Sequence, residues 1–416
     1  MNISDVYDQR KSFFIEAPSF LRLGALICVG VGIASMAAGF ATGMGTRVWG
    51  AFLFNLFFFF CLGLGGMAFA AMQDVIGANW GRPIRRIQEA FGAFVPVGIA
   101  LLTVYLVLVL ARVGPAGDVY SWIRDPSVLN HFHGKDKYLV PFWFGVRVAV
   151  VLLAMLWVSL FQFKMSIKRD QLFLEGNNDE AAFKLAKEAQ SKLKFWSAPI
   201  LVVYGVGFTF LGMDLIMSLS PLWFSTLWGG WQFAVMMQTL MASLLITMFI
   251  LKDSNPGKYI QRQQFHDVGK LMHGFTIFFA YLTYAHVLTY WYGNMPEETE
   301  YFLERLHEPW IYLVLTIPIF GFVIPLYTLI FKAAKWTKAV AMPLSIIILG
   351  AQWLTYMLIT MPVLVKAEDF TSPGLEIGVF IGMLGLFVTC FCWFAKRFPM
   401  LPLTDPLLKD AIEGHH

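Results

Sequence analysis

Ten long apolar stretches run through this chain, and they constrain its fold more than any other feature. A helix needs about 20 residues to cross a hydrocarbon layer about 30 Å thick, and every stretch is at least that long. Only 14% of the residues are charged, against about 25% in ordinary soluble domains. The sequence therefore predicts membrane-spanning helices over residues 20–41, 49–76, 88–110, 139–163, 196–218, 228–251, 267–292, 309–331, 339–361 and 374–394.

The fold class that follows is an all-α polytopic membrane protein, because a β-barrel would show short segments of alternating polarity instead. Residues 1–416 are predicted to form a single integral membrane domain. Two loops stand out by their length. Residues 164–195 begin acidic and end basic, which favours a surface helix. Residues 111–138 are long enough to cap the bundle or to contact a partner protein.

The distribution of Lys and Arg predicts the orientation of the chain. Loops on one side of the predicted spans hold 21 of the 31 basic residues, and loops on the other side hold 7. Basic residues stay in the cytoplasm, so both termini are expected there. The net charge of +4 reflects this topology, and we do not expect a nucleic-acid partner.

Metal-binding residues are scarce in the predicted spans. The four cysteines (Cys28, Cys61, Cys390 and Cys392) lie inside spans without CxxC or CxxCH spacing. His273 and His286 lie well inside a span, but they share the same one. We therefore expect this chain to bind no haem, Fe–S cluster or other metal, so that any redox role depends on partner proteins.

An ionisable side chain in hydrocarbon costs about 2.5–3.5 kcal/mol and usually faces the bundle interior with a partner. Arg147 and Asp214 lie near the outer ends of the fourth and fifth predicted spans, at depths that would let them pair. Asp214 could exchange protons or hydrogen-bond a quinol, or it could be a packing residue. The pair could equally be structural, and the sequence leaves these alternatives open.

The seventh span carries a polar stripe. His266, Lys270, His273 and Tyr284 fall near one another on a helical wheel, with Asp267 beside them. Such a stripe can relay protons, but Lys270 and His266 can also snorkel to the interface. His286 points to a different face, where a packed neutral histidine is expected.

Charged residues also gather between the second and third spans. Asp74 follows Gln73 at the end of one span, and Glu89 begins the next after Arg82, Arg85 and Arg86. This pattern predicts either an interfacial charge cluster or the inner mouth of a proton path.

Four segments together resemble a known family. They are FAAMQDVIGANWGRPIRRIQE (69–89), KDKYLVPFWFGVR (135–147), MDLIMSLSPLWFSTLWG (213–229) and FHDVGKLMHGFTIFFAYLTYAHVLTYWYGNMPEET (265–299). In these segments the chain resembles the NrfD-like membrane subunits of polysulfide and nitrite reductase complexes. It is most similar to the second, smaller quinone-binding-type subunit of alternative complex III, a bacterial quinol:cytochrome c oxidoreductase.

The resemblance implies two four-helix bundles with peripheral helices, in a bacterial inner membrane. It implies a larger NrfD-like sister subunit, multihaem cytochrome c and Fe–S subunits as partners, with haem and Fe–S clusters held by those partners. A quinol such as menaquinol would be the substrate of the complex. The matching quinone-site positions here are Asp214 and Arg147, with His131 or His133 in the covering loop.

We therefore expect a haem-free integral subunit of a quinol-oxidising complex, which scaffolds the complex, contacts quinone and conducts protons. Two alternatives from other classes stay open. One is a proton-coupled secondary transporter, suggested by ten spans with intramembrane charges. The other is a purely structural membrane anchor.

Overall fold

The computed structural model describes residues 10–129, 134–174, 180–405 and 407–413, and these form helices without β-strands. Ten helical segments are long and apolar enough to cross a membrane, which confirms the predicted polytopic all-α class. The spanning elements are α2 (Ser19–Ala41), α3 (Gly45–Ile76), α4 and α5 (Arg85–Gly92 and Val95–Leu110), α8 (Pro141–Leu174), α9 (Glu180–Leu215), α10 (Trp228–Leu251), α11 (Arg262–Gly293), α13 and α14 (Trp310–Pro318 and Ile324–Ile330), α16 (Lys338–Leu364) and α17 (Gly374–Arg397).

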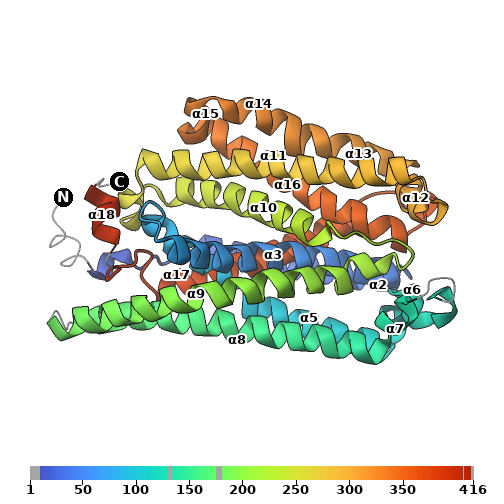
Figure 1. The fold of residues 1–416 in the computed structure, drawn as a ribbon, viewed down its shortest axis with the longest axis horizontal. Coiled ribbons are helices and arrows are strands. Elements are labelled where there is room, and N and C mark those ends of the chain that lie inside the picture. The colour runs from blue at the N-terminus through green and yellow to red at the C-terminus, as the bar shows by residue number, and fades with distance from the viewer. Residues whose placement is uncertain (1–9, 130–133, 175–179, 406, 414–416) are drawn as a thin grey trace.

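The spanning helices pack into the two predicted four-helix bundles. The first bundle contains α3, α4–α5, α8 and α9, and the second contains α10, α11, α13–α14 and α16. Figure 1 shows α8 and α9 along the lower edge and α11, α13 and α14 along the upper edge. Helices α3 and α10 lie between them and are almost wholly buried. Helices α2 and α17 pack against each other and against α3 as the peripheral pair.

The two ends of the molecule differ in what covers them. The short helix α18 (Leu408–Glu413) lies at one end, here named the α18 end, and α12 (Pro296–Leu303) lies at the opposite α12 end (Figure 1). The segment after α17 lies at the α18 end, where Phe13, Tyr259 and Leu401 form a small apolar cluster. By the distribution of Lys and Arg, the α18 end is the predicted cytoplasmic end.

Two of the spans are irregular. The third begins with a 3₁₀ turn (η2, Arg82–Ile84), continues as α4 and is interrupted at residues 93–94 before α5. The eighth contains a π-helical turn (η8, Ile319–Val323) directly after Pro318, whose ring prevents a regular α-helical hydrogen bond. The Gln238 side chain from α10 donates to the Gly321 carbonyl at 2.9 Å, which satisfies a backbone group of this turn within the bundle.

Helices α2 and α17 come unusually close because glycines face each other. A Cβ built on Gly32 would lie 2.6 Å from the Gly382 Cα, closer than real Cβ contacts. Small residues allow this backbone approach in membranes, where packing rather than hydrophobic exclusion drives helix association.

Two loops differ in detail from the prediction. The helix expected within 164–195 is present from Glu180, but it is continuous with the fifth span as α9, and α8 likewise extends to Leu174. Residues 175–179 lie outside the described chain. The 111–138 loop folds into η3 (Gly114–Asp118), α6 (Ser121–Arg124), η4 (Pro126–Leu129) and α7 (Lys135–Tyr138). The buried Trp122 indole of this loop donates to the Ser218 carbonyl at 3.0 Å, so the loop caps the first bundle.

Candidate functional site

Eight buried charged side chains at the α18 end of the first bundle form a closed ring in which acids and arginines alternate. We call this set the charge ring. In order around it, the members are Asp74, Arg82, Asp405, Arg169, Asp170, Arg86, Glu89 and Arg85, which contacts Asp74 again. Every neighbouring pair lies within salt-bridge distance, and each residue is at most 1% exposed except Asp405, at 4%.

Local geometry from α3 through η2 to α4 brings five of the eight ring members together. Helix α3 ends at Ile76 and is capped by Gly77, whose positive φ of 65° lets the chain turn back on itself. This turn places Arg85 beside Asp74, with Nη1 to Oδ1 at 2.5 Å and Nη2 to Oδ2 at 2.6 Å. On α4, Arg85 and Arg86 reach Glu89 from four and three residues away, at 3.0 and 2.6 Å.

The other three ring members come from distant parts of the chain. Arg169 and Asp170 lie near the end of α8, and Asp405 lies in the segment that follows α17. Asp405 Oδ2 contacts Arg82 at 3.2 Å and Arg169 at 3.0 Å. Thr404 donates its hydroxyl to Asp170 at 2.5 Å. The ring therefore fastens the C-terminal segment to the first bundle.

Pairing of opposite charges explains how eight charges can be buried at one place. Transferring a charge out of water costs several kcal/mol, and the cost is recovered only with good geometry and further hydrogen bonds. Four carboxylates and four guanidinium groups make the ring neutral. Gln190 adds two of the further hydrogen bonds, since it accepts from Arg169 at 2.6 Å and donates to Asp74 at 3.2 Å.

Several buried polar atoms in and beside the ring have no hydrogen-bond partner among the described residues. They include Arg86 Nε, Arg169 Nη2 and both side-chain polar atoms of Gln73 and of Gln88. Buried polar groups of this kind are usually satisfied by ordered water. The ring and its surroundings are therefore expected to be hydrated.

A line of polar side chains leads from the ring toward the middle of the bundle. We name it the α8 ladder, and its members are Ser166, Gln162, Ser159 and Tyr204. Ser166 donates to Glu89 Oε1 at 2.7 Å. Tyr204 donates to Gln162 Oε1 at 3.2 Å and lies 3.0 Å from the Ser159 hydroxyl. Successive members on α8 lie about one helical turn apart, roughly 5–6 Å.

Apolar side chains fill the first bundle beyond the ladder. Along α8, Met155, Leu152 and Val148 are buried, and so are Phe208 and Leu211 on α9, in the same apolar core. Ser159 and Arg147 are twelve residues apart, which corresponds to about 18 Å along the helix. The ladder and the α12 end are therefore separated by a thick apolar layer.

The predicted contact between Arg147 and Asp214 is present at the α12 end of this layer. Two hydrogen bonds join the side chains, from Nε to Oδ2 at 3.1 Å and from Nη2 to Oδ1 at 3.0 Å. Asp214 is 1% exposed, whereas 23% of the Arg147 side chain is exposed. The Arg147 guanidinium also lies over the Tyr138 ring, 3.8 Å from its centroid. His131 and His133, the other predicted quinone contacts, lie outside the described residues.

Lys135 fixes the covering loop near this pair. Its ammonium group donates to the Pro221 carbonyl at 2.6 Å and lies 3.4 Å from the Trp223 carbonyl oxygen. Burial disfavours the charged form and lowers the pKa of Lys135 to about 8.

The polar stripe predicted on the seventh span does not reach the interior of the second bundle. Lys270 pairs with Asp267 at 2.6 Å, but 54% of its side chain is exposed, and Tyr284 is 63% exposed. His266 and His273 are partly buried. Lys270 and Tyr284 therefore face outward on α11, and no hydrogen bond or ion pair joins a described residue of the stripe to the charge ring.

Sequence reasoning found Asp74, Glu89 and three of the ring arginines but missed Arg169, Asp170 and Asp405. These three fall in segments predicted as cytoplasmic loop and tail, where charges are ordinary. The adjacent Arg169 and Asp170, soon after an apolar run, could have suggested a longer helix. Another buried pair was also missed, in which Arg47 Nε donates to Glu376 Oε1 at 2.8 Å.

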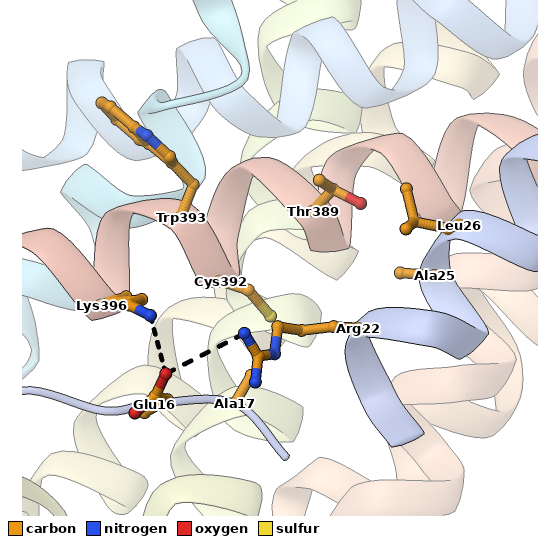
Figure 2. A pocket seen from close by; sticks show the side chains of 9 residues that line it. All are labelled: Glu16, Ala17, Arg22, Ala25, Leu26, Thr389, Cys392, Trp393 and Lys396. Carbon is orange, nitrogen blue, oxygen red and sulfur yellow. Dashed lines mark hydrogen bonds and ion pairs between the residues drawn. The ribbon is translucent and has the colours of Figure 1, made fainter. Parts of the chain in front are cut away.

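A small cavity of about 220 Å³ lies between α2 and α17, away from the ring. Figure 2 shows Glu16 between Lys396 and Arg22, at 2.7 and 3.9 Å, and the cavity is also lined by apolar groups such as Leu26 and Trp393. These three charged side chains are about half exposed or more, so they form an ordinary surface cluster and not a second buried site.

Within the described part of the chain, no group of three or more His, Cys, Asp or Glu residues is arranged to hold a metal ion. Comparison with models of known protein families and with curated proteins finds no match to this sequence.

Proposed function

We propose that this chain is a haem-free integral subunit of a quinol-oxidising respiratory complex of the alternative complex III type, and that its first bundle conducts protons. The charge ring with its attached α8 ladder is the observation that supports this function best. A membrane anchor needs buried ion pairs at most, but it does not need a polar line from them into the hydrocarbon layer. The sequence resemblance supports the class of complex.

In this function, Glu89 is the proton-holding group at the inner end of the ladder. It contacts two arginines and the Ser166 hydroxyl, and a carboxylate in such a network can take up or release a proton when a neighbouring group moves. Hydroxyl groups can donate and accept at once. Ser166, Ser159 and Tyr204 therefore pass the proton toward the middle of the bundle, with water beside Gln162.

The apolar layer between Tyr204 and Asp214 divides the path into two halves. It prevents an uncontrolled leak, because a proton crossing it needs transient water. Arg147 and Asp214 belong to the outer half, where a quinone head from the membrane or from a sister subunit would be contacted. The α18 end then faces the cytoplasm of a bacterial cell.

Because we expect this chain to hold no redox groups, its partner proteins would have to carry the electrons. A larger NrfD-like subunit, a multihaem cytochrome c and an Fe–S subunit would carry the electrons. The peripheral helices α2 and α17, with their exposed apolar side chains, would contact lipids or these subunits.

The test is purification of the tagged full-length chain from its native membrane. We expect haem-containing proteins to co-purify, with quinol:cytochrome c turnover and proton translocation in proteoliposomes. Glu89→Gln should abolish most of the translocation while haem content stays unchanged. Glu376→Gln, which alters a buried paired carboxylate outside the ring, is the matched control and should translocate normally.

Each alternative has a distinct outcome. A chain that purifies alone and moves a solute in liposomes would be a transporter, and the proposed complex would be wrong. A haem-containing complex in which Glu89→Gln translocates protons at the normal rate would contradict the proton path, which leaves a structural anchor.

A further inference from the structure

We propose that the α12 end of the second bundle holds a separate binding site for a neutral membrane-soluble molecule with a flat ring that carries carbonyl oxygens, the chemistry of a quinone head. A cavity of about 540 Å³ lies between α10, α11, α12, α13 and α16. This volume is typical of ligand sites. The cavity shares no lining residue with the charge ring, the α8 ladder or the Arg147–Asp214 pair, so the inference does not depend on the proposed function.

Aromatic faces form the walls of the cavity. Trp223 stacks on Tyr301 with ring centroids 4.1 Å apart and planes 8° apart. Trp228 stacks on Trp231 at 5.2 Å, and the His286 ring lies within 6.4 Å of Trp223 and 6.1 Å of Trp231. Walls of this kind favour a planar ring, because offset stacking and edge contacts add to burial of apolar area.

Three polar atoms in these walls lack a hydrogen-bond partner among the described residues. They are Trp223 Nε1, Trp228 Nε1 and His286 Nε2, in side chains that are only 4%, 2% and 7% exposed. The neighbouring Trp231 differs, since its indole donates to Thr283 Oγ1 at 2.9 Å. An unpaired buried donor is costly, and a ring oxygen of a ligand would accept from it.

The charge of the lining selects a neutral ligand. Among the described residues that line the cavity, Arg305 is the one charged side chain. Its guanidinium already donates to the carbonyls of Leu358 and Ile359, both at 3.1 Å, and to that of Tyr301. A phosphate head group would therefore find no uncommitted cation here, whereas a carbonyl oxygen needs none.

The rim of the cavity gives access from the membrane. Val287, Trp291 and Leu303 line it and are 46%, 74% and 55% exposed. An entrance framed by exposed apolar groups near the membrane surface suits a ligand with an apolar tail, which would extend past these residues into the lipid.

The test measures equilibrium binding of a short-tailed naphthoquinone to the full-length chain in lipid nanodiscs. We expect saturable binding in the unmodified chain. Trp228→Phe and His286→Leu should each weaken it about tenfold, because each removes one hydrogen bond to a ligand oxygen. Trp231→Phe should weaken it less, because that indole is already paired, and Trp353→Phe, outside the cavity, should not change it.

Thermal unfolding of each variant separates loss of the site from loss of the fold. Unchanged affinity in well-folded Trp228→Phe and His286→Leu, or displacement of the probe by phosphatidylglycerol at equal concentration, would overturn the assignment. Tyr204→Phe, in the α8 ladder, should leave the affinity unchanged, so the site and the proton path can fail independently.

Discussion

The charge ring and the Arg147–Asp214 pair are both buried ionic sites of the first bundle, but they are built differently. Each ring member contacts two opposite charges, and seven of the eight are at most 1% exposed. Arg147 contacts one carboxylate and keeps about a quarter of its side chain exposed. A closed network is held in one arrangement, whereas an isolated pair beside solvent can separate and re-form at a lower energetic cost. This difference predicts that breaking a contact costs more in the ring than in the pair.

The largest expected effect is from Arg85→Met. The substitution removes one ion-pair partner from each of Asp74 and Glu89. The free energy of unfolding should therefore fall by about 3–5 kcal/mol. Unfolding in mixed micelles measures this change. Arg22→Met is the control, since its side chain is about half exposed and 3.9 Å from Glu16, and the change there should be below about 1 kcal/mol. A similar effect for both would mean that the ring is not a cooperative unit.

Arg147→Met should destabilise the fold less than Arg85→Met, by about 1–3 kcal/mol, because water reaches the group that remains. A double-mutant cycle with Asp214→Asn measures the coupling between the two side chains. Coupling as strong as that between Arg85 and Asp74 would erase the contrast between the two sites.

Thr404→Ala tests how the ring holds the C-terminal segment. The hydroxyl donates to Asp170, so its loss should cost about 1 kcal/mol and expose this segment to protease. Thr389→Ala, which removes a hydroxyl bonded only to its own helix, should have little effect. Equal protease resistance of both variants would show that Thr404 does not fasten the segment.

The smallest effect concerns pH at the covering loop. The pKa of Lys135 is about 8 in the folded chain, below the usual value of about 10.4. Between these values the unfolded chain binds more protons, so this group makes the folded state more stable as pH rises from about 8 to 10. Unfolding of wild type and Lys135→Met across this range should show the difference in slope, and parallel curves would contradict the lowered pKa.

The ten spans and the Arg147–Asp214 contact could be predicted because both follow from local pattern and depth. Long apolar runs must be helical in lipid. Two opposite charges at similar depth in the membrane are expected to pair, because pairing lowers the cost of burying them. The closed ring could not be predicted in the same way. Asp405 joins the ring because the segment after α17 packs against the first bundle. No periodicity in the sequence predicts where that segment packs.

The polar stripe on α11 illustrates the opposite difficulty. Its residues share one face of the helix, but a helical wheel does not say which face the bundle buries. Lys270 and Tyr284 are largely exposed, whereas the wheel left both a proton relay and snorkelling open. The aromatic cavity could not be predicted from the sequence, because Trp and Tyr occur both at membrane interfaces and in ligand sites.

Proton uptake by proteoliposomes that contain the purified complex, compared between Tyr204→Phe and Tyr356→Phe, tests the central claim most directly. Both tyrosines are fully buried, but Tyr204 belongs to the α8 ladder and Tyr356 contacts Cys61 instead. We expect Tyr204→Phe to lose most of its proton uptake during quinol oxidation, and Tyr356→Phe to keep it. Equal uptake by the two variants, with both complexes intact, would contradict a proton path through the first bundle.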